Sequence, residues 1–134
     1  MRIIKKIAFA FFKNKKILLV RSMDEESVFY TLGGKSKNGE DDIPCLKREV
    51  FEEIGCRIDE SSIKFLKEFE DIAHRRKDTL LNIRLYEGKL IGEPKKRSEI
   101  AEIGFFDSNS PKENLSEIAQ RKIFPWLQIQ GFIN

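Results

Sequence analysis

One stretch of the chain, residues 43 to 54, constrains both the fold and the chemistry. Leu46, Val50 and Ile54 recur within it at every fourth position. That spacing places the three side chains on one side of an α-helix, where they can pack against a core. The stretch therefore predicts a helix with one apolar face.

The ends of this helix are also marked. Asp41 or Asp42 can cap its first turn, and Pro44 is tolerated there because an N–H in the first turn has no partner within the helix. Gly55 follows the last periodic residue and can adopt the left-handed conformation that ends many helices. We therefore expect the helix to end just before Gly55.

The same helix carries three glutamates, Glu49, Glu52 and Glu53, at positions that share one face. Like charges at this spacing destabilise an isolated helix by about 0.2–0.5 kcal/mol per pair, and a bound cation would remove that cost. Ligands that are all oxygen suit Mg²⁺ or Mn²⁺. The alternative is a solvated acidic face that is balanced by Lys47 and Arg48.

A phosphate-binding loop is a second interpretation of the same region. Gly33, Gly34, Lys35 and Ser36 resemble the end of the loop that binds nucleoside triphosphates. That motif requires a further glycine five residues before Gly34 and a helix directly after the loop. Position 29 is Phe29, so the chain does not contain this motif.

The rest of the chain is rich in short apolar runs. Ile3–Phe12 and Ile17–Arg21 flank a polar turn at residues 13 to 16 and predict a hairpin. Further runs predict strands at Val28–Leu32, Ile63–Phe69, Thr79–Glu87 and Ile103–Phe106, and a last helix at Leu115–Leu127 that is broken or bent at Pro125. Periodicity alone thus gives strands around one helix, with a second helix at the end.

Composition limits the kind of protein. With 134 residues we expect one domain over residues 1–134. A net charge of +3, from 25 basic and 22 acidic side chains that are mixed along the chain, gives no reason to expect nucleic acid or a membrane as partner. Cys45 and Cys56 are not spaced as a metal or redox pair, and we expect both to be reduced core residues of a cytoplasmic protein.

A longer pattern surrounds the three glutamates. The residues from Gly34 to Cys56 resemble the signature of the Nudix hydrolase family, including its MutT-like members. The matching positions are Gly34, Glu40, Arg48, Glu49, Val50, Glu52, Glu53 and Gly55. Two positions depart from the family pattern: Cys56 replaces the usual aliphatic residue, and Leu32 stands where proline is common in the segment FYTLGGK.

The resemblance implies an α/β fold, an α/β/α sandwich with a mixed central sheet. It also implies an enzyme that cleaves the pyrophosphate of a nucleoside diphosphate derivative, in which a metal-activated water attacks phosphorus. On this basis Glu49, Glu52 and Glu53 hold Mg²⁺, for which Mn²⁺ can substitute, and the Gly33 carbonyl is a further ligand. Glu52 and Glu53 are also candidate catalytic residues.

The resemblance gives other residues supporting roles. Glu40 and Arg48 would orient the carboxylates that bind the metal. The general base is open among Glu99, which stands six residues before Phe105 in a loop, its neighbour Glu102, and a glutamate of the helix.

Substrate contacts are expected at four positions: Gly34 and Lys35, Tyr30 as a surface for base stacking, and Arg75 within the basic run from residue 74 to 77. The predicted substrate is a nucleoside triphosphate, with ADP-ribose or a dinucleoside polyphosphate as alternatives. A nucleotide-binding sensor module with little catalysis is the alternative from another functional class, and a homodimer is compatible with the family.

Overall fold

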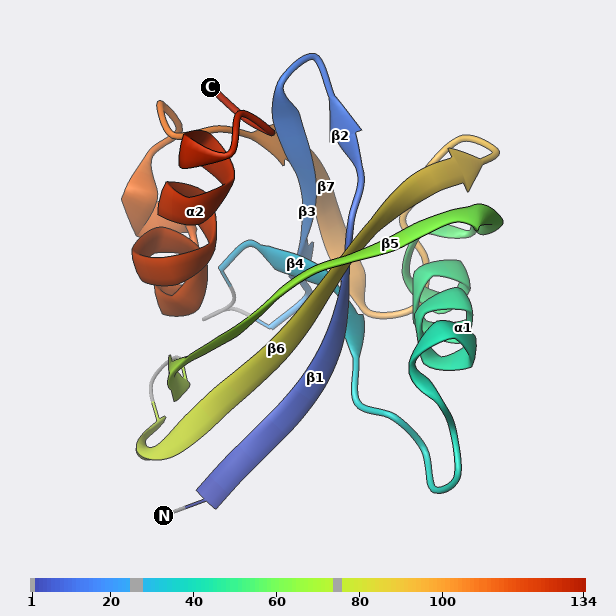
Figure 1. Ribbon diagram of the computed structural model, residues 1–134, viewed down its shortest axis with the longest axis horizontal. Helices are drawn as coiled ribbons and strands as arrows, with labels where there is room; N and C mark the ends of the chain where they lie inside the picture. Colours follow the sequence, from blue (N-terminus) through green and yellow to red (C-terminus); the bar gives the residue numbers. More distant parts are fainter. Residues whose placement is uncertain (1, 25–27, 74–75) are drawn as a thin grey trace.

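The structure is a computed structural model that describes residues 2–24, 28–73 and 76–134. Its strands form one seven-stranded sheet that curls through the molecule (Figure 1). They are β1 (Arg2–Ala10), β2 (Phe12–Lys13), β3 (Lys16–Ser22), β4 (Tyr30–Gly34), β5 (Arg57–Ala73), β6 (Arg76–Ile91) and β7 (Ile100–Phe106). The helical elements are α1 (Asp42–Ile54), a 3₁₀ turn η1 (Lys112–Asn114), a π-helix η2 (Ala119–Ile123) and α2 (Phe124–Ile129).

The sheet is mixed. Its strand order is β2-β3-β4-β1-β6-β5, and β7 pairs with β3 outside this path. The central strands β1 and β6 run parallel, whereas β4 pairs with β1, and β5 with β6, in antiparallel fashion. The long chain segment between β1 and β6 includes α1, as a parallel connection requires. This arrangement brings β4, β1 and β6 side by side at the centre of the molecule.

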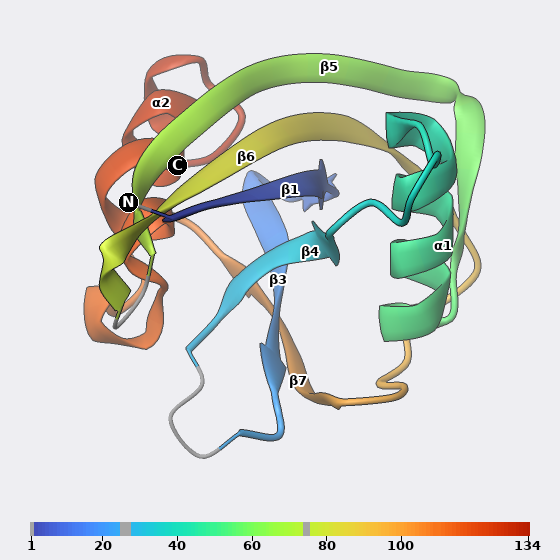
Figure 2. The ribbon, with the colours of Figure 1, turned by 90° about the horizontal axis from the view of Figure 1, so that it is seen from below.

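Helices cover opposite sides of the sheet. Figure 2 shows α1 at one side of β1, β4 and β6, and α2 at the other. Two buried clusters fill the space between these layers. One joins α1 to the sheet through residues such as Leu46, Val50, Ile54, Phe9 and Leu32. The other joins the C-terminal helices to the opposite face through residues such as Ile123, Leu127, Leu19 and Leu85.

The first helix is confirmed with small differences at its start. It ends as predicted at Gly55, which has a φ of 71°, and Leu46, Val50 and Ile54 are buried as predicted. Asp41 is the N-cap residue but makes no side-chain cap hydrogen bond. Asp42 instead accepts hydrogen bonds from the guanidinium of Arg84, one of them at 3.1 Å from Nε, and from the Tyr86 hydroxyl. These bonds join the start of α1 to β6.

The predicted N-terminal hairpin is wrong in its partners. The first strand ends at Ala10, and the short strand β2 after it forms the hairpin with β3. Asn14 and Lys15, with φ of 53° and 60°, form the turn. The chain changes direction at Phe11, so β1 is free to pair with β4 and β6. A continuous apolar run does not reveal such a bend, because its residues are apolar on both sides of it.

The other predicted elements differ mainly at their ends. The predicted strand Val28–Leu32 is observed as Tyr30–Gly34, and β5 and β6 are both longer than predicted. The C-terminal helix is irregular near Pro125, as expected, but the irregularity is a π-helical turn that precedes the proline. Because proline has no N–H to donate, the wider turn accommodates the interrupted hydrogen-bond ladder.

Two further expectations concern the whole chain. Cys45 and Cys56 are both buried and free, as predicted. Within the described ranges, no helix has the length and apolar character needed to cross a membrane.

Candidate active site

The paired glycines at the end of β4 define the floor of the site. A side chain at Gly33 would place its Cβ 2.0 Å from the Ile7 carbonyl oxygen, and the φ of 128° at Gly33 is strained for other residues. A Cβ at Gly34 would lie 2.5 Å from the carboxyl carbon of Glu49. One glycine therefore permits the close approach of β4 to β1, and the other leaves room for a carboxylate of α1.

The glutamates of α1 meet this glycine turn. The backbone N–H of Gly33 donates a hydrogen bond of 2.9 Å to Oε1 of Glu53. Glu49 lies against Gly34, and Glu52, one helical turn away on the same face, is more exposed. The structure thus brings Glu49 and Glu53 to the Gly33-Gly34 turn, whereas Glu52 contacts Arg48 on the more exposed side of the helix.

Arg48 connects the site to the loop before the helix. Its Nε and Nη2 each donate a hydrogen bond of 2.8 Å to the two carboxylate oxygens of Glu40. Its Nη1 donates to Glu49 at 2.8 Å and to Glu52 at 3.4 Å, and Nη2 also donates to the Lys35 carbonyl at 3.1 Å. The pair with Glu52, one turn away on the helix, is the longest of these contacts. Arg48 therefore acts mainly as a fork between Glu40 and Glu49.

The pKa shifts follow this arrangement. The hydrogen bonds from Arg48 lower the pKa of Glu40 to about 2, so Glu40 is a charged partner for Arg48 at neutral pH. Burial raises the pKa of Glu53 to about 8, and the neighbouring charges of Glu49 and Glu52 add to this rise. The N–H of Gly33 opposes it. Charge on Glu53 is thus costly unless a cation is close.

The donor set fits a hard divalent cation. It consists of carboxylate oxygens that repel one another beside the Gly33-Gly34 turn. As the side chains stand in residues 2–24, 28–73 and 76–134, no three acidic, histidine or cysteine side chains surround a common point. Glu49 and Glu52 instead accept hydrogen bonds from Arg48. Metal binding would therefore require these carboxylates to turn away from the guanidinium.

The two loop candidates for a general base have different surroundings. Glu102, in β7, is held by Arg21, whose Nε donates to it at 2.9 Å. Glu99 precedes β7 with an exposed side chain, and its charge is felt by the Tyr30 hydroxyl. The backbone of Arg97, two residues earlier, donates a hydrogen bond of 3.2 Å to the Glu53 carbonyl. These contacts place the Glu99 segment beside the end of α1.

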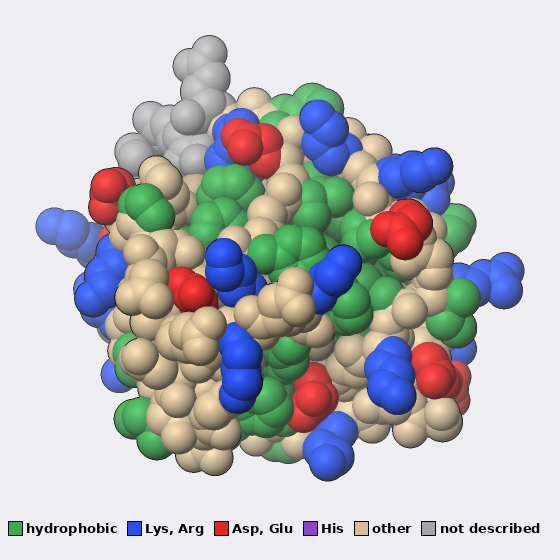
Figure 3. All heavy atoms as spheres, turned by 90° about the horizontal axis from the view of Figure 1, so that it is seen from above, with side chains coloured by type: hydrophobic (Ala, Val, Ile, Leu, Met, Phe, Trp, Pro, Cys, Tyr) green, Lys and Arg blue, Asp and Glu red, His purple; other side chains and the backbone are tan. Residues whose placement is uncertain are grey.

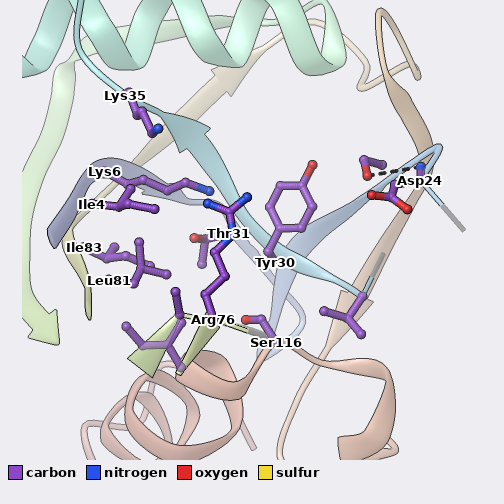
Figure 4. Close-up of a pocket in the computed structure, with 14 residues that line it drawn as sticks. Ile4, Lys6, Asp24, Tyr30, Thr31, Lys35, Arg76, Leu81, Ile83 and Ser116 are labelled. Carbon is purple, nitrogen blue, oxygen red and sulfur yellow. Dashed lines mark hydrogen bonds between the residues drawn. The ribbon is translucent and has the colours of Figure 1, made fainter. Parts of the chain in front are cut away.

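A cavity of about 530 Å³ is lined by side chains of β1, β4 and β6 (Figure 4). Burial lowers the pKa of one of its lining residues, Lys6, and the nearby charge of Glu53 opposes this shift. Tyr30 and Lys35, which the sequence predicted as substrate contacts, line this cavity. Phe29, the neighbour of Tyr30, packs instead on Phe106, with a ring-centroid separation of 4.5 Å. The strand alternation at this point thus turns Tyr30 toward the cavity. Arg75 lies outside the described residues.

Sequence reasoning missed Lys6 as a site residue. It lies in an apolar strand, yet its side chain enters the cavity and its ammonium lies 5.4 Å from the centre of the Tyr30 ring. A charged residue at an inward position of a central strand was the available signal, but only the pairing of β1 with both β4 and β6 shows that Lys6 is central.

Comparison with known proteins identifies the relatives of this fold. The family model for the NUDIX domain matches residues 5–127. A search of curated proteins finds no match.

Solved structures resemble the whole chain. A MutT NUDIX hydrolase from Burkholderia pseudomallei has a TM-score of 0.76 at 19% identity, over 93% of this chain and 98% of that chain. The E. coli ORF135 protein has a TM-score of 0.73 at 15% identity, over 97% and 92% of the two chains. A UDP-X diphosphatase has a TM-score of 0.73 at 23% identity, over 98% of this chain and 64% of that chain. These likenesses confirm the predicted α/β/α sandwich.

The Arg48 fork gives a test of the site's geometry. We expect Arg48→Lys to lower the midpoint of thermal unfolding by a few degrees, because one ammonium cannot bond both Glu40 and Glu49 as the planar guanidinium does. Arg121→Lys is the matched control, since Arg121 also bonds two acids but its side chain is 49% exposed, against 21% for Arg48. Equal shifts in the two variants, measured by calorimetry, would contradict the special role of Arg48.

Proposed function

This chain belongs to the Nudix hydrolase family, and we propose that it is a Mg²⁺-dependent enzyme that cleaves the pyrophosphate linkage of a nucleoside triphosphate. The observation that carries the proposal is the meeting of Glu49 and Glu53 with the Gly33-Gly34 turn beside a cavity. Mn²⁺ can replace Mg²⁺ because both prefer oxygen ligands.

Glu49, Glu52 and Glu53 are the residues that would hold the ion, with the Gly33 carbonyl as a further ligand. When bound, a divalent cation supplies charge that neutralises phosphate oxygens and lowers the pKa of a coordinated water. In the protein alone, Arg48 joins Glu49 to Glu40 and keeps this carboxylate close to the glycine turn, from which it would turn toward the ion.

The remaining residues act on the substrate and on the attacking water. Lys35, in the loop that follows the glycine turn, supplies a positive charge to the phosphate oxygens. Gly34, whose open side is filled by the Glu49 carboxylate, stays a predicted substrate contact. Tyr30 offers its ring to the nucleoside. Glu99 accepts the proton of the water, because its carboxylate is not held by an ion pair within the described residues, whereas Glu102 is held by Arg21.

Other substrates and another functional class are kept as alternatives. The likeness to a UDP-X diphosphatase supports testing other nucleoside diphosphate derivatives, including ADP-ribose and dinucleoside polyphosphates. A nucleotide sensor with weak catalysis would be expected to lack a glutamate of the signature, and here all of them are present. This favours the enzyme over the sensor.

Two further proposals concern the setting of the protein. The free, buried Cys45 and Cys56 support a reducing compartment, which for this chain would be the cytoplasm. Figure 3 shows a face on which basic and acidic side chains are mixed with hydrophobic ones, consistent with a small nucleotide rather than a nucleic acid as partner. A homodimer stays a prediction.

A screen of substrates tests the proposed function directly. We expect release of phosphate or pyrophosphate from nucleoside triphosphates with Mg²⁺, loss of release after chelation, and recovery when Mg²⁺ or Mn²⁺ is added. Nucleoside triphosphates, sugar nucleotides, ADP-ribose and dinucleoside polyphosphates should be compared at equal concentration. Activity that persists in excess chelator would contradict the role of the metal, and no turnover of any of these compounds would support the sensor.

The role of Glu53 can be tested by charge removal. We expect Glu53→Gln to lower turnover by about a hundredfold or more, because it removes a charged ligand, while the amide keeps the volume of this partly buried side chain. The midpoint of thermal unfolding should change little. Glu60→Gln is a control that removes an exposed acid paired with Lys47, and it should leave turnover unchanged. Equal turnover in Glu53→Gln and the wild type would rule out the assignment.

Two matched variants test the identity of the general base. We expect Glu99→Gln to lower turnover by about 10²–10⁴-fold, the usual contribution of a base, with Mn²⁺ affinity nearly intact. Glu102→Gln should reduce turnover much less, because Glu102 is already engaged with Arg21. Turnover and Mn²⁺ binding should be measured on both variants. Near wild-type turnover in Glu99→Gln would move the base to Glu102 or to the helix.

A further inference from the structure

The cavity near the glutamates is lined by several positively charged side chains. Three cations line it: Lys6 from β1, Lys35 from the loop after β4, and Arg76 from the start of β6. No ion pair forms between any of the three and the residues that the structure describes. Asp24 also lines the cavity, but Figure 4 shows it on the other side of Tyr30 from Lys6 and Arg76.

The strand pairings fix the order of these cations. Ile7 pairs with Gly34 across β1 and β4, so Lys6 and Lys35 are neighbours just beyond the last paired residues. Lys6 lies opposite Ile83 in the parallel pairing of β1 with β6. Lys35 is thus at the end of the cavity near the glutamates.

Arg76 lies at the other end. It begins β6, and Figure 4 shows its guanidinium reaching toward the tip of Lys6 beside the Tyr30 ring. Lys6 therefore lies between the two ends, beside Lys35 in the strand pairing and close to the guanidinium of Arg76 in Figure 4. Burial lowers the pKa of Lys6, the charges of Lys35 and Arg76 lower it further, and the charge of Glu53 opposes this shift. An anion between Lys6 and Arg76 would offset both the repulsion and the cost of burial.

The walls around these two cations suit a nucleoside. Ile4 and Lys6 alternate on one face of β1, and their partners Leu81 and Ile83 share the same face of β6. An apolar strip therefore leads along the sheet to the charged tips, and Tyr30 closes one side of the space. A sugar and base can rest on this strip while the phosphate chain stays by the glutamates and Lys35.

We propose that Lys6 and Arg76 determine specificity by binding a phosphate ester on the nucleoside, separate from the phosphate chain that is cleaved. The proposal rests on the proposed function, because that function places the phosphate chain beside the glutamates. It names a substrate class within that function: a nucleoside diphosphate derivative whose sugar carries a phosphate of its own at the 2′ or 3′ position.

Binding in the presence of chelator tests this without turnover. The probes are adenosine 5′-monophosphate, adenosine 2′,5′- and 3′,5′-bisphosphate, and ADP, titrated into the protein by calorimetry. We expect at least one bisphosphate to bind about tenfold or more tightly than the monophosphate, as a charge-assisted hydrogen bond allows, and ADP to gain less. Lys6→Met and Arg76→Met should each reduce the advantage of the bisphosphate to about twofold or less.

The control is Lys77→Met, which removes the same charge one residue along β6 from a side chain that does not line the cavity. It should preserve the advantage of the bisphosphate. Equal binding of the monophosphate and both bisphosphates to the wild type would overturn the proposal, as would an equal loss in Lys77→Met and Arg76→Met. An equal gain for ADP that Arg76→Met abolishes would assign the cations to the phosphate chain and also overturn it. Because no step requires hydrolysis, these results are independent of whether the substrate screen finds turnover.

Discussion

The repulsion among the carboxylates of α1 is the interaction on which the rest of the site depends. Glu49 and Glu53 are pressed against the Gly33-Gly34 turn, where burial and mutual repulsion raise the pKa of Glu53 to about 8. Arg48 balances part of this charge through its contacts with Glu40 and Glu49. In the protein alone, this guanidinium stabilises the carboxylates. They remain available to a divalent cation that binds together with a polyphosphate. The site is therefore stable without a ligand, and its carboxylates can still rearrange when a cation binds.

The parallel pairing of β1 with β6 gives this site its neighbouring cavity. β1 also pairs with β4, and the pair at the end of this contact is Ile7 with Gly34. Lys6, the residue before Ile7, therefore lies between the glycine turn and β6. The bonds from Arg84 and Tyr86 to Asp42 fix the start of α1 to the same strand β6. The proposed metal ligands and the cavity walls are thus attached to the same part of the sheet, which suits a reaction that depends on positioning a phosphate chain.

Local signals in the sequence predicted α1 and its glutamates well, because helix periodicity, the final glycine and the acidic spacing all lie within one short segment. The family resemblance added the layers of the fold. The pairing of distant strands was harder to predict from the sequence. No local sequence signal marks the bend at Phe11, because it lies within an apolar run, yet this bend lets β1 pair with β4 and β6 instead of forming the hairpin. Lys6 was missed for the same reason, since its importance depends on the strands beside it. The assignment of Arg48 mainly to Glu40, eight residues away, likewise required the three-dimensional path of the loop.

The central claim is that Glu49, Glu52 and Glu53 together hold the ion. A crystal structure with Mn²⁺, located by its anomalous scattering, tests it most directly. We predict one or more peaks within bonding distance of carboxylate oxygens from these three residues, with the Glu49 carboxylate turned from Arg48 toward the ion. Mn²⁺ bound elsewhere, with Glu49 and Glu52 still hydrogen-bonded to Arg48, would contradict the account.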